Sequence, residues 1–172
     1  MKKIILTVLV FLSISAASFA QKYAYVDTDY ILENIPEYND AQDILNELSA
    51  RWQKEIEAKY SELDKLYRSY QAESALLPAD IKQKKEEEII ANEKAIKQFQ
   101  QDKFGPEGEL YSKRIELVQP IQEKIFNVIS EIAESRNYDF IFDKAGNMNI
   151  LYSDPRLDLS DEVLDQLGMI IQ

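Results

Sequence analysis

Two long stretches of the chain carry apolar side chains at steps of three and four residues, the pattern of helices that pack along one face. The first stretch covers residues 37–77 and contains neither glycine nor proline. A helix over this range would be about 60 Å long and could not bury its apolar stripe alone. The stripe consists of Ala41, Leu45, Leu48, Trp52, Ile56, Tyr60, Leu63, Tyr67, Tyr70 and Leu77.

The second stretch, residues 79–119, supplies the partner helix. Pro78 disfavours helical geometry at Leu77 and so marks a turn between two ranges of equal length. The sequence therefore predicts an antiparallel hairpin with coiled-coil packing. We expect Gly105-Pro106 to kink the return helix and Pro120 to end it. The apolar positions of this stretch are Ile81, Ile89, Ile96, Phe99, Phe104, Leu110, Ile115 and Val118.

The remaining residues predict a small mixed body. A strand at Tyr23–Val26 and a helical turn at Asp29–Glu33 precede the hairpin, and a deeply buried helix follows Pro120 and ends near Arg136-Asn137. Two further strands are expected at Tyr138–Asp143 and Met148–Tyr152, around a turn in which Gly146 supplies a positive φ. A last helix is expected from an N-capping Ser160, through a Leu159–Leu164 staple, to Gly168.

The fold class is thus α+β, mainly α, with a long helical hairpin projecting from a small β-containing body. Residues 21–36 and 120–172 form the body, and residues 37–119 form arms inserted in it. Such a small core needs disulfides, metals or association, and the chain has no cysteine and no visible metal cluster. Association then rests on Tyr25, Val26, Phe140, Ile141, Phe142, Ile150 and Leu151; the alternative is that these residues fill a monomeric core.

The first twenty residues have the pattern of a secretory signal peptide. Lys2 and Lys3 are followed by an apolar run at Ile4–Ile14, and small residues occupy Ser18 and Ala20. The apolar run is shorter than the roughly 20 residues of a membrane-spanning helix. We therefore expect residues 1–20 to be removed before Gln21, and the mature chain to be exported without stable membrane insertion.

Composition removes most enzyme classes. The absence of histidine and cysteine excludes Ser-His and Cys-His nucleophilic sites and nearly all zinc sites. Asp139, Asp143 and Asp154 could be imagined as a metal cluster, but acidic residues at strand ends and turns usually face solvent. No glycine cluster has the pattern of a phosphate-binding loop. We expect no catalytic residue, cofactor or metal.

Charge also restricts the partners. The formal net charge is −11, and loss of Lys2 and Lys3 with the signal peptide makes it −13. Nucleic-acid binding is not expected, because the chain lacks a basic stripe. Lys82, Lys84 and Lys85 are followed at once by residues 86–88, all glutamate, which is typical of a solvated helix face.

At this point the chain resembles the periplasmic Skp/OmpH family of outer-membrane protein chaperones over residues 21–172. The resemblance rests on an ordered set of segments, most specifically those at the C-terminal end. These segments are Tyr25-Val26-Asp27, Ile35-Pro36-Glu37-Tyr38, Gln119-Pro120-Ile121-Gln122-Glu123-Lys124, Tyr138-Asp139-Phe140-Ile141-Phe142-Asp143-Lys144, Ile150-Leu151-Tyr152, Asp154-Pro155 and Asp161-Glu162-Val163-Leu164.

The resemblance implies a periplasmic homotrimer of jellyfish shape, whose hairpins enclose a cavity that holds unfolded outer-membrane β-barrel proteins without nucleotide. The chain departs from the family in two ways. Its acidity argues against contact with lipopolysaccharide or anionic lipid, and Gly105-Pro106-Glu107-Gly108 breaks an arm that would otherwise be continuous.

Client contact is expected along the arms and above all at their tip, where Leu76 and Leu77 have little else to bury them. The full candidate set is Leu76, Leu77, Ile81, Tyr67, Tyr70 and Phe99. For any one of Tyr60, Tyr67 and Tyr70, packing between the arms is the favoured alternative to client contact. A structural coiled-coil protein that binds one fixed, folded envelope partner would share the same hairpin, and this alternative stays open.

Overall fold

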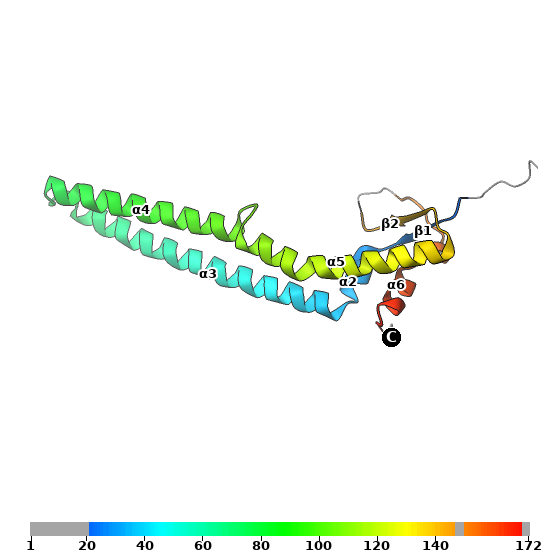
Figure 1. The fold of residues 1–172 in the computed structure, drawn as a ribbon. Coiled ribbons are helices and arrows are strands. Elements are labelled where there is room, and N and C mark those ends of the chain that lie inside the picture. The colour runs from blue at the N-terminus through cyan, green and yellow to red at the C-terminus, as the bar shows by residue number, and fades with distance from the viewer. Residues whose placement is uncertain (1–20, 147–149, 170–172) are drawn as a thin grey trace, which may run out of the picture. The chain divides into compact units, whose positions relative to one another are not determined.

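The computed structural model describes residues 21–146 and 150–169, which form two compact units (Figure 1). One unit comprises Met1–Ile31 and Phe126–Gln172, and the other comprises Leu32–Ile125. We refer to the described parts of these as the body unit and the arm unit. The elements are β1 (Tyr23–Val26), α2 (Thr28–Glu33), α3 (Pro36–Glu73), α4 (Ala79–Phe104), α5 (Glu109–Arg136), β2 (Phe140–Asp143), the 3-10 helix η1 (Pro155–Leu157) and α6 (Ser160–Gln166).

The arm unit is an antiparallel helical hairpin, which confirms the predicted fold class. Helix α3 has 38 residues, about 57 Å at 1.5 Å per residue, and lies beside α4 (Figure 1). It starts on Pro36, which is tolerated in the first turn of a helix. Helix α3 ends at Glu73, four residues before the predicted end, because residues 74–76 form the turn and the Leu76 N–H bonds to the Glu73 carbonyl at 2.9 Å.

The predicted stripe is buried mainly in the part of the hairpin that is remote from the tip. Ala41, Leu45 and Val118 form a buried cluster, with Tyr38, Leu110 and Leu117 packed against it. Trp52 and Ile96 are the other apolar residues that are almost fully buried along α3 and α4. Toward the tip the described residues are mostly exposed, so burial within one chain does not account for their apolar character.

Pro120 does not end a helix, contrary to the prediction, but lies inside α5. A proline in a helix interior removes one backbone hydrogen bond and costs about 3 kcal/mol. Val118, Ile121 and Ile125 are all buried around it. Burying each such side chain contributes roughly 1.5–3 kcal/mol, so packing on both sides of Pro120 offsets the cost and the helix continues.

Gly105-Pro106 likewise does more than kink the return helix. Helix α4 ends at Phe104, residues 105–108 form a turn, and α5 begins at Glu109. The predicted single return helix is therefore two helices. Pro106 has no N–H, and its ring would clash with the preceding turn of a continuing helix, so the helix stops here. Glycine suits the exit at residue 105, because a Cβ there would collide with the backbone oxygen of Gln101.

The body unit contains a two-stranded parallel sheet. Strands β1 and β2 pair from Tyr23 opposite Phe140 to Val26 opposite Asp143. The chain after η1 returns to β1, where the Leu159 N–H bonds to the Tyr25 carbonyl at 2.9 Å. The core of this unit includes Val26, Ile31, Ile132, Val163 and Leu164, and the last four are fully buried or nearly so.

The ends of the last two helices follow the prediction in most respects. Helix α5 ends at Arg136, where Asn137 has a positive φ of 53°. Gly168 has a φ of 78°, and the Met169 N–H bonds to the Leu164 carbonyl, which closes α6 as expected. Leu159 and Leu164, the predicted staple, are both buried.

Three details of the body were predicted wrongly. Ile150–Tyr152 form no strand, while Met148 and Asn149 of that prediction lie outside the described residues, as does Asn147 of the predicted turn. Gly146 does not have a positive φ. Ser160 is the first residue of α6 and not its cap; the Asp158 carboxylate accepts from the Ser160 N–H instead, at 2.9 Å.

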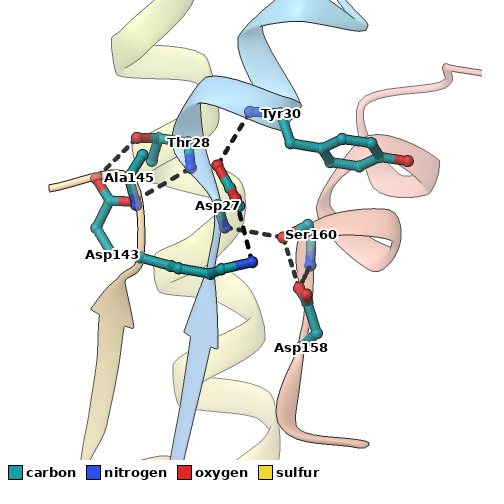
Figure 2. A network of polar contacts seen from close by, with 8 residues as sticks. Asp27, Thr28, Tyr30, Asp143, Ala145, Asp158 and Ser160 are labelled. Carbon is teal, nitrogen blue, oxygen red and sulfur yellow. Dashed lines mark hydrogen bonds and ion pairs between the residues drawn. The ribbon is translucent and has the colours of Figure 1, made fainter. Parts of the chain in front are cut away.

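Two hydroxyl–carboxylate pairs join the segments of the body (Figure 2). Ser160 Oγ accepts from the Asp27 N–H at 2.9 Å and donates to Asp158 at 2.6 Å. Thr28 Oγ1 donates to Asp143 at 2.7 Å. We call these five residues the polar clasp, because they tie the start of α2 to the end of β2 and the start of α6.

Replacing Ser160 with Ala should lower the free energy of unfolding by about 1–3 kcal/mol, because Ser160 is 3 % exposed and the Asp27 N–H would lose its acceptor. The control is Ser69→Ala, which removes an exposed bond to Glu73 and should change stability by less than about 0.5 kcal/mol. Urea unfolding at one fixed subunit concentration measures both. Equal midpoints for the two variants would contradict a stabilising role for the clasp.

Candidate functional site

The hairpin tip presents the most exposed apolar side chain of the arm unit. Leu76 is 88 % exposed in the turn that joins α3 to α4. Leu77 beside it is half-buried, and Ile81 on the first turns of α4 is partly exposed. The tip is held by an ion pair of 2.7 Å between Lys85 and Glu73, which lowers the pKa of the Glu73 carboxyl.

The tyrosines below the tip differ in environment. Tyr67 is 47 % exposed on α3. Tyr70 is half-buried and donates its hydroxyl to the Glu86 carboxylate across the hairpin, which raises the pKa of Tyr70 to about 12. The phenol of Tyr70 is therefore neutral at ordinary pH and joins α3 to α4, while Tyr67 is available to a partner.

Phe99 lies apart from the tip residues. It follows Ile81 by eighteen positions on α4, about 27 Å along the helix. The ammonium groups of Lys59 and Lys103 lie 5.2 and 5.6 Å from the centre of its ring. A hollow of about 370 Å³ between α3 and α4 is lined by Lys59, Glu62, Leu63, Leu66, Asn92, Ala95, Ile96 and Phe99. The six candidate residues are thus spread along the arm and do not line one pocket.

Sequence reasoning missed some exposed apolar residues of the arm. Ile90 is 63 % exposed on α4, and Ile44 and Tyr111 are also exposed. Ile90 directly follows Ile89, and adjacent helical residues point about 100° apart, so one of the two had to leave the buried stripe. The adjacent pair Ile89-Ile90 is therefore the sequence signal that predicts one exposed isoleucine on α4.

The seven residues expected to mediate assembly fall into two groups in the body unit. Tyr25 and Val26 are buried within the chain itself. The others are half-buried or exposed, and Leu151 is 99 % exposed. Phe140 and Phe142 stack with ring centres 6.0 Å apart.

An apolar hollow of about 370 Å³ adjoins this sheet. It is lined by Tyr23, Ala24, Tyr25, Phe142, Ile150, Tyr152, Ser153, Asp154 and Leu157. Tyr23, Phe140 and Tyr152 of the body unit are exposed, as is Leu151. With the half-buried Phe142, five large apolar side chains of this unit are at least partly exposed. An exposed apolar area of this kind typically marks an interaction surface.

The three aspartates considered as a metal cluster each have a protein partner. Asp139 accepts from the Lys22 N–H at 2.7 Å, Asp143 belongs to the polar clasp, and Asp154 accepts from the Arg156 N–H and guanidinium. The Arg156 guanidinium holds the pKa of Asp154 below its usual range. Residues 21–146 and 150–169 contain no group of three acidic, cysteine or histidine side chains placed to hold a metal ion.

None of the helices in the described part of the chain is long and apolar enough to cross a membrane. The predicted signal peptide at residues 1–20 lies outside the described residues.

The arm and body units together define a protein with an antiparallel helical hairpin and a small mixed body. The OmpH-like outer membrane protein family matches residues 22–167, so the chain belongs to this family, as its sequence segments indicated. A protein of Aquifex aeolicus without an assigned function is 28 % identical over 154 residues, covering 90 % of each chain. A crystal structure described as an OmpH-like outer membrane chaperone of Caulobacter crescentus has a TM-score of 0.67 at 11 % identity, and the match covers 88 % of this chain and 86 % of that one.

Proposed function

We propose that the mature chain is an ATP-independent periplasmic holdase that binds unfolded outer-membrane β-barrel proteins and prevents their aggregation. The observation that carries the proposal is that exposed apolar side chains are spread along an otherwise charged hairpin, in a chain of the OmpH-like family. A stable helical pair does not need Leu76, Ile90 or Tyr67 exposed, whereas a surface that holds apolar segments does.

Unfolded barrel strands carry apolar side chains at alternate positions. Each contact with a partly exposed residue such as Tyr67 or Ile81 would contribute less than the roughly 1.5–3 kcal/mol of full burial. Several weak contacts at once retain the client through high effective concentration. Each contact still opens readily, so the client can be released without nucleotide.

The proposal assigns the arms, residues 37–119, to holding and the body, residues 21–36 and 120–172, to assembly as a homotrimer. Three hairpins would then enclose a cavity, and Leu76, Leu77, Ile81, Tyr67, Tyr70 and Phe99 would contact the client. Export by a signal peptide cleaved before Gln21 would place the protein in the periplasm, between the inner membrane that its clients cross and the outer membrane into which they insert. The net charge makes lipopolysaccharide and anionic lipid unsuitable partners.

The salt dependence of client binding distinguishes capture by apolar contacts from capture by ion pairs. The segments 37–77 and 79–119 carry only −4 and −1. Affinity for an unfolded barrel protein should therefore change little between roughly 50 and 300 mM salt, a range over which charge interactions become strongly screened. Fluorescence anisotropy of a labelled, urea-diluted barrel protein measures this affinity.

In the same assay, Leu76→Ser with Leu77→Ser should weaken binding more than Lys82→Gln with Lys84→Gln. Lys82 and Lys84 are exposed, and Lys85 is left intact because it pairs with Glu73 at the tip. A steep loss of affinity with salt, or a larger effect of the lysine pair, would contradict apolar capture.

A further inference from the structure

Lys22 fastens the N-terminal end of the body unit to the segment between α5 and β2. Its N–H donates to the Asp139 carboxylate at 2.7 Å, and its carbonyl accepts from the Asp139 N–H at 2.7 Å. Its ammonium group donates to the Arg136 carbonyl at 2.9 Å and lies 4.3 Å from the centre of the Tyr138 ring. An ammonium at the C-terminal end of a helix is favourable, because the helix dipole is negative there. Lys22 therefore stabilises both the end of α5 and the start of the pairing between β1 and β2.

Gln21, the residue before it, takes no part in these contacts. Gln21 is exposed, and no residue within 21–146 and 150–169 forms a hydrogen bond with it. The Lys22 N–H belongs to the peptide bond that follows Gln21, so its bond to Asp139 uses neither the backbone nitrogen nor the carboxamide of Gln21. Both of these groups are therefore available for chemistry once the preceding residue is removed.

Cleavage before Gln21 would convert the Gln21 nitrogen from an amide into an amine. An amide nitrogen is a poor nucleophile, whereas a fraction of an α-amino group is uncharged at neutral pH and can attack a carbonyl carbon. The α-nitrogen of a glutamine reaches its own Cδ through a five-membered ring, so the two reacting groups are always close together. The expected cleavage site thus places a self-reactive residue at the start of the mature chain.

We propose that Gln21 is a modification site, and that the mature chain begins with pyroglutamate. The Gln21 nitrogen forms a bond to Cδ, and the bond from Cδ to Nε2 breaks. The Nε2 group takes a proton from the α-nitrogen and leaves as ammonia, so the product is a neutral lactam and no other reactant is consumed. The inference rests on the proposed export of the chain. The Lys22 N–H is retained in the product and keeps its bond to Asp139.

The lactam would protect the contacts of Lys22. Chain termini are preferred sites of proteolysis, and an aminopeptidase needs the free α-amino group that a lactam lacks. Removal of Gln21 and Lys22 would leave the Arg136 carbonyl without the ammonium group, and Asp139 without its backbone partners. The modification therefore keeps in place the residue that joins the start of β1 to the end of α5.

The intact mass of the mature chain tests the modification. The full precursor is produced in a Gram-negative host, and the chain purified from the periplasm is measured at once and after several days at neutral pH. The mass should become that of residues 21–172 less one molecule of ammonia. N-terminal sequencing should be blocked until a pyroglutamyl peptidase removes the lactam. The matched control is Gln21→Asn, which keeps a carboxamide but would need a strained four-membered ring, and should retain its full mass.

The two ways in which this test can fail are distinguishable. A Gln21 that is still open to sequencing after the incubation would overturn the modification and leave the proposed export intact. A chain that begins at another residue would overturn the expected cleavage site together with the modification.

A broad-specificity aminopeptidase tests the protection of Lys22. The cyclised chain should keep its mass, whereas the Gln21→Asn chain should lose its first two residues. The trimmed chain should unfold at a lower urea concentration than the cyclised chain, at the same subunit concentration. Equal resistance of the two chains to the peptidase, or equal unfolding midpoints after trimming, would overturn the protective role.

Discussion

Removing two heptads from each helix of the arm should abolish most client holding while the body stays folded and assembled. The hairpin register specifies the deletion: residues 59–72 of α3 lie opposite residues 85–98 of α4. Fourteen residues from each helix shorten the arm by about 21 Å and preserve its heptad phase. The shortened chain loses Tyr60, Tyr67, Tyr70 and Ile90 but keeps Trp52, Phe104 and the tip residues Leu76 and Leu77. It also loses Lys85 and with it the ion pair to Glu73, so circular dichroism must show that the tip still folds.

Aggregation of a urea-diluted barrel protein, followed by turbidity, measures the holding, while circular dichroism and light scattering check fold and mass. The matched control is the deletion of residues 105–108, which leaves the exposed apolar side chains of the arm intact and should leave most of the holding in place. If the shortened chain suppresses aggregation as well as the full chain, the arms act as spacers. That result would favour the alternative function, a structural coiled-coil protein that binds one folded envelope partner.

Phe142→Asp should dissociate the assembly into single chains. Phe142 lines the apolar hollow of the body and stacks on Phe140. A carboxylate enclosed there by other subunits would have no partner, which costs several kcal/mol at each copy of the interface. Light scattering should show the mass of one chain, and holding should fall with it, because the proposed cavity needs more than one hairpin.

Leu76→Asp is the control for this substitution. It places the same charge on the exposed tip of the arm and should leave the mass unchanged. If the Phe142 variant unfolds by circular dichroism, the milder Phe142→Ala tests the same surface through the concentration at which the assembly dissociates. Assembly of Phe142→Asp at full mass would place the interface elsewhere.

The long-range plan of the fold could be predicted because it depends on local signals. The steps of three and four in residues 37–77 and the Leu77-Pro78 turn predict the hairpin, and the β-prone run at Tyr23–Val26 predicts β1. The errors arose where tertiary packing opposed a local rule. Pro120 usually breaks a helix, but Val118 and Ile121 are buried on either side of it, and sequence alone does not weigh these contributions.

The candidate client-contact residues also divide into those whose environment follows from local sequence and those whose environment depends on the tertiary fold. Leu76 could be predicted as exposed because a hairpin tip has no neighbour to cover it, and it is. Tyr67 and Tyr70 occupy the same stripe, yet only Tyr70 has an acidic partner across the hairpin, and that depends on a register set by the whole arm. Phe99 is a client-contact candidate by its apolar character, and its position on α4 places it about 27 Å along the helix from Ile81.

Aggregation suppression by the full mature chain tests the central claim most directly. An outer-membrane β-barrel protein is diluted from urea, without nucleotide, in the absence or presence of increasing amounts of the chain from Gln21 to Gln172. Holding by several weak apolar contacts predicts that turbidity falls progressively and vanishes at a fixed ratio of chain to client, without added ATP. Turbidity that develops equally fast at every ratio would contradict the holdase.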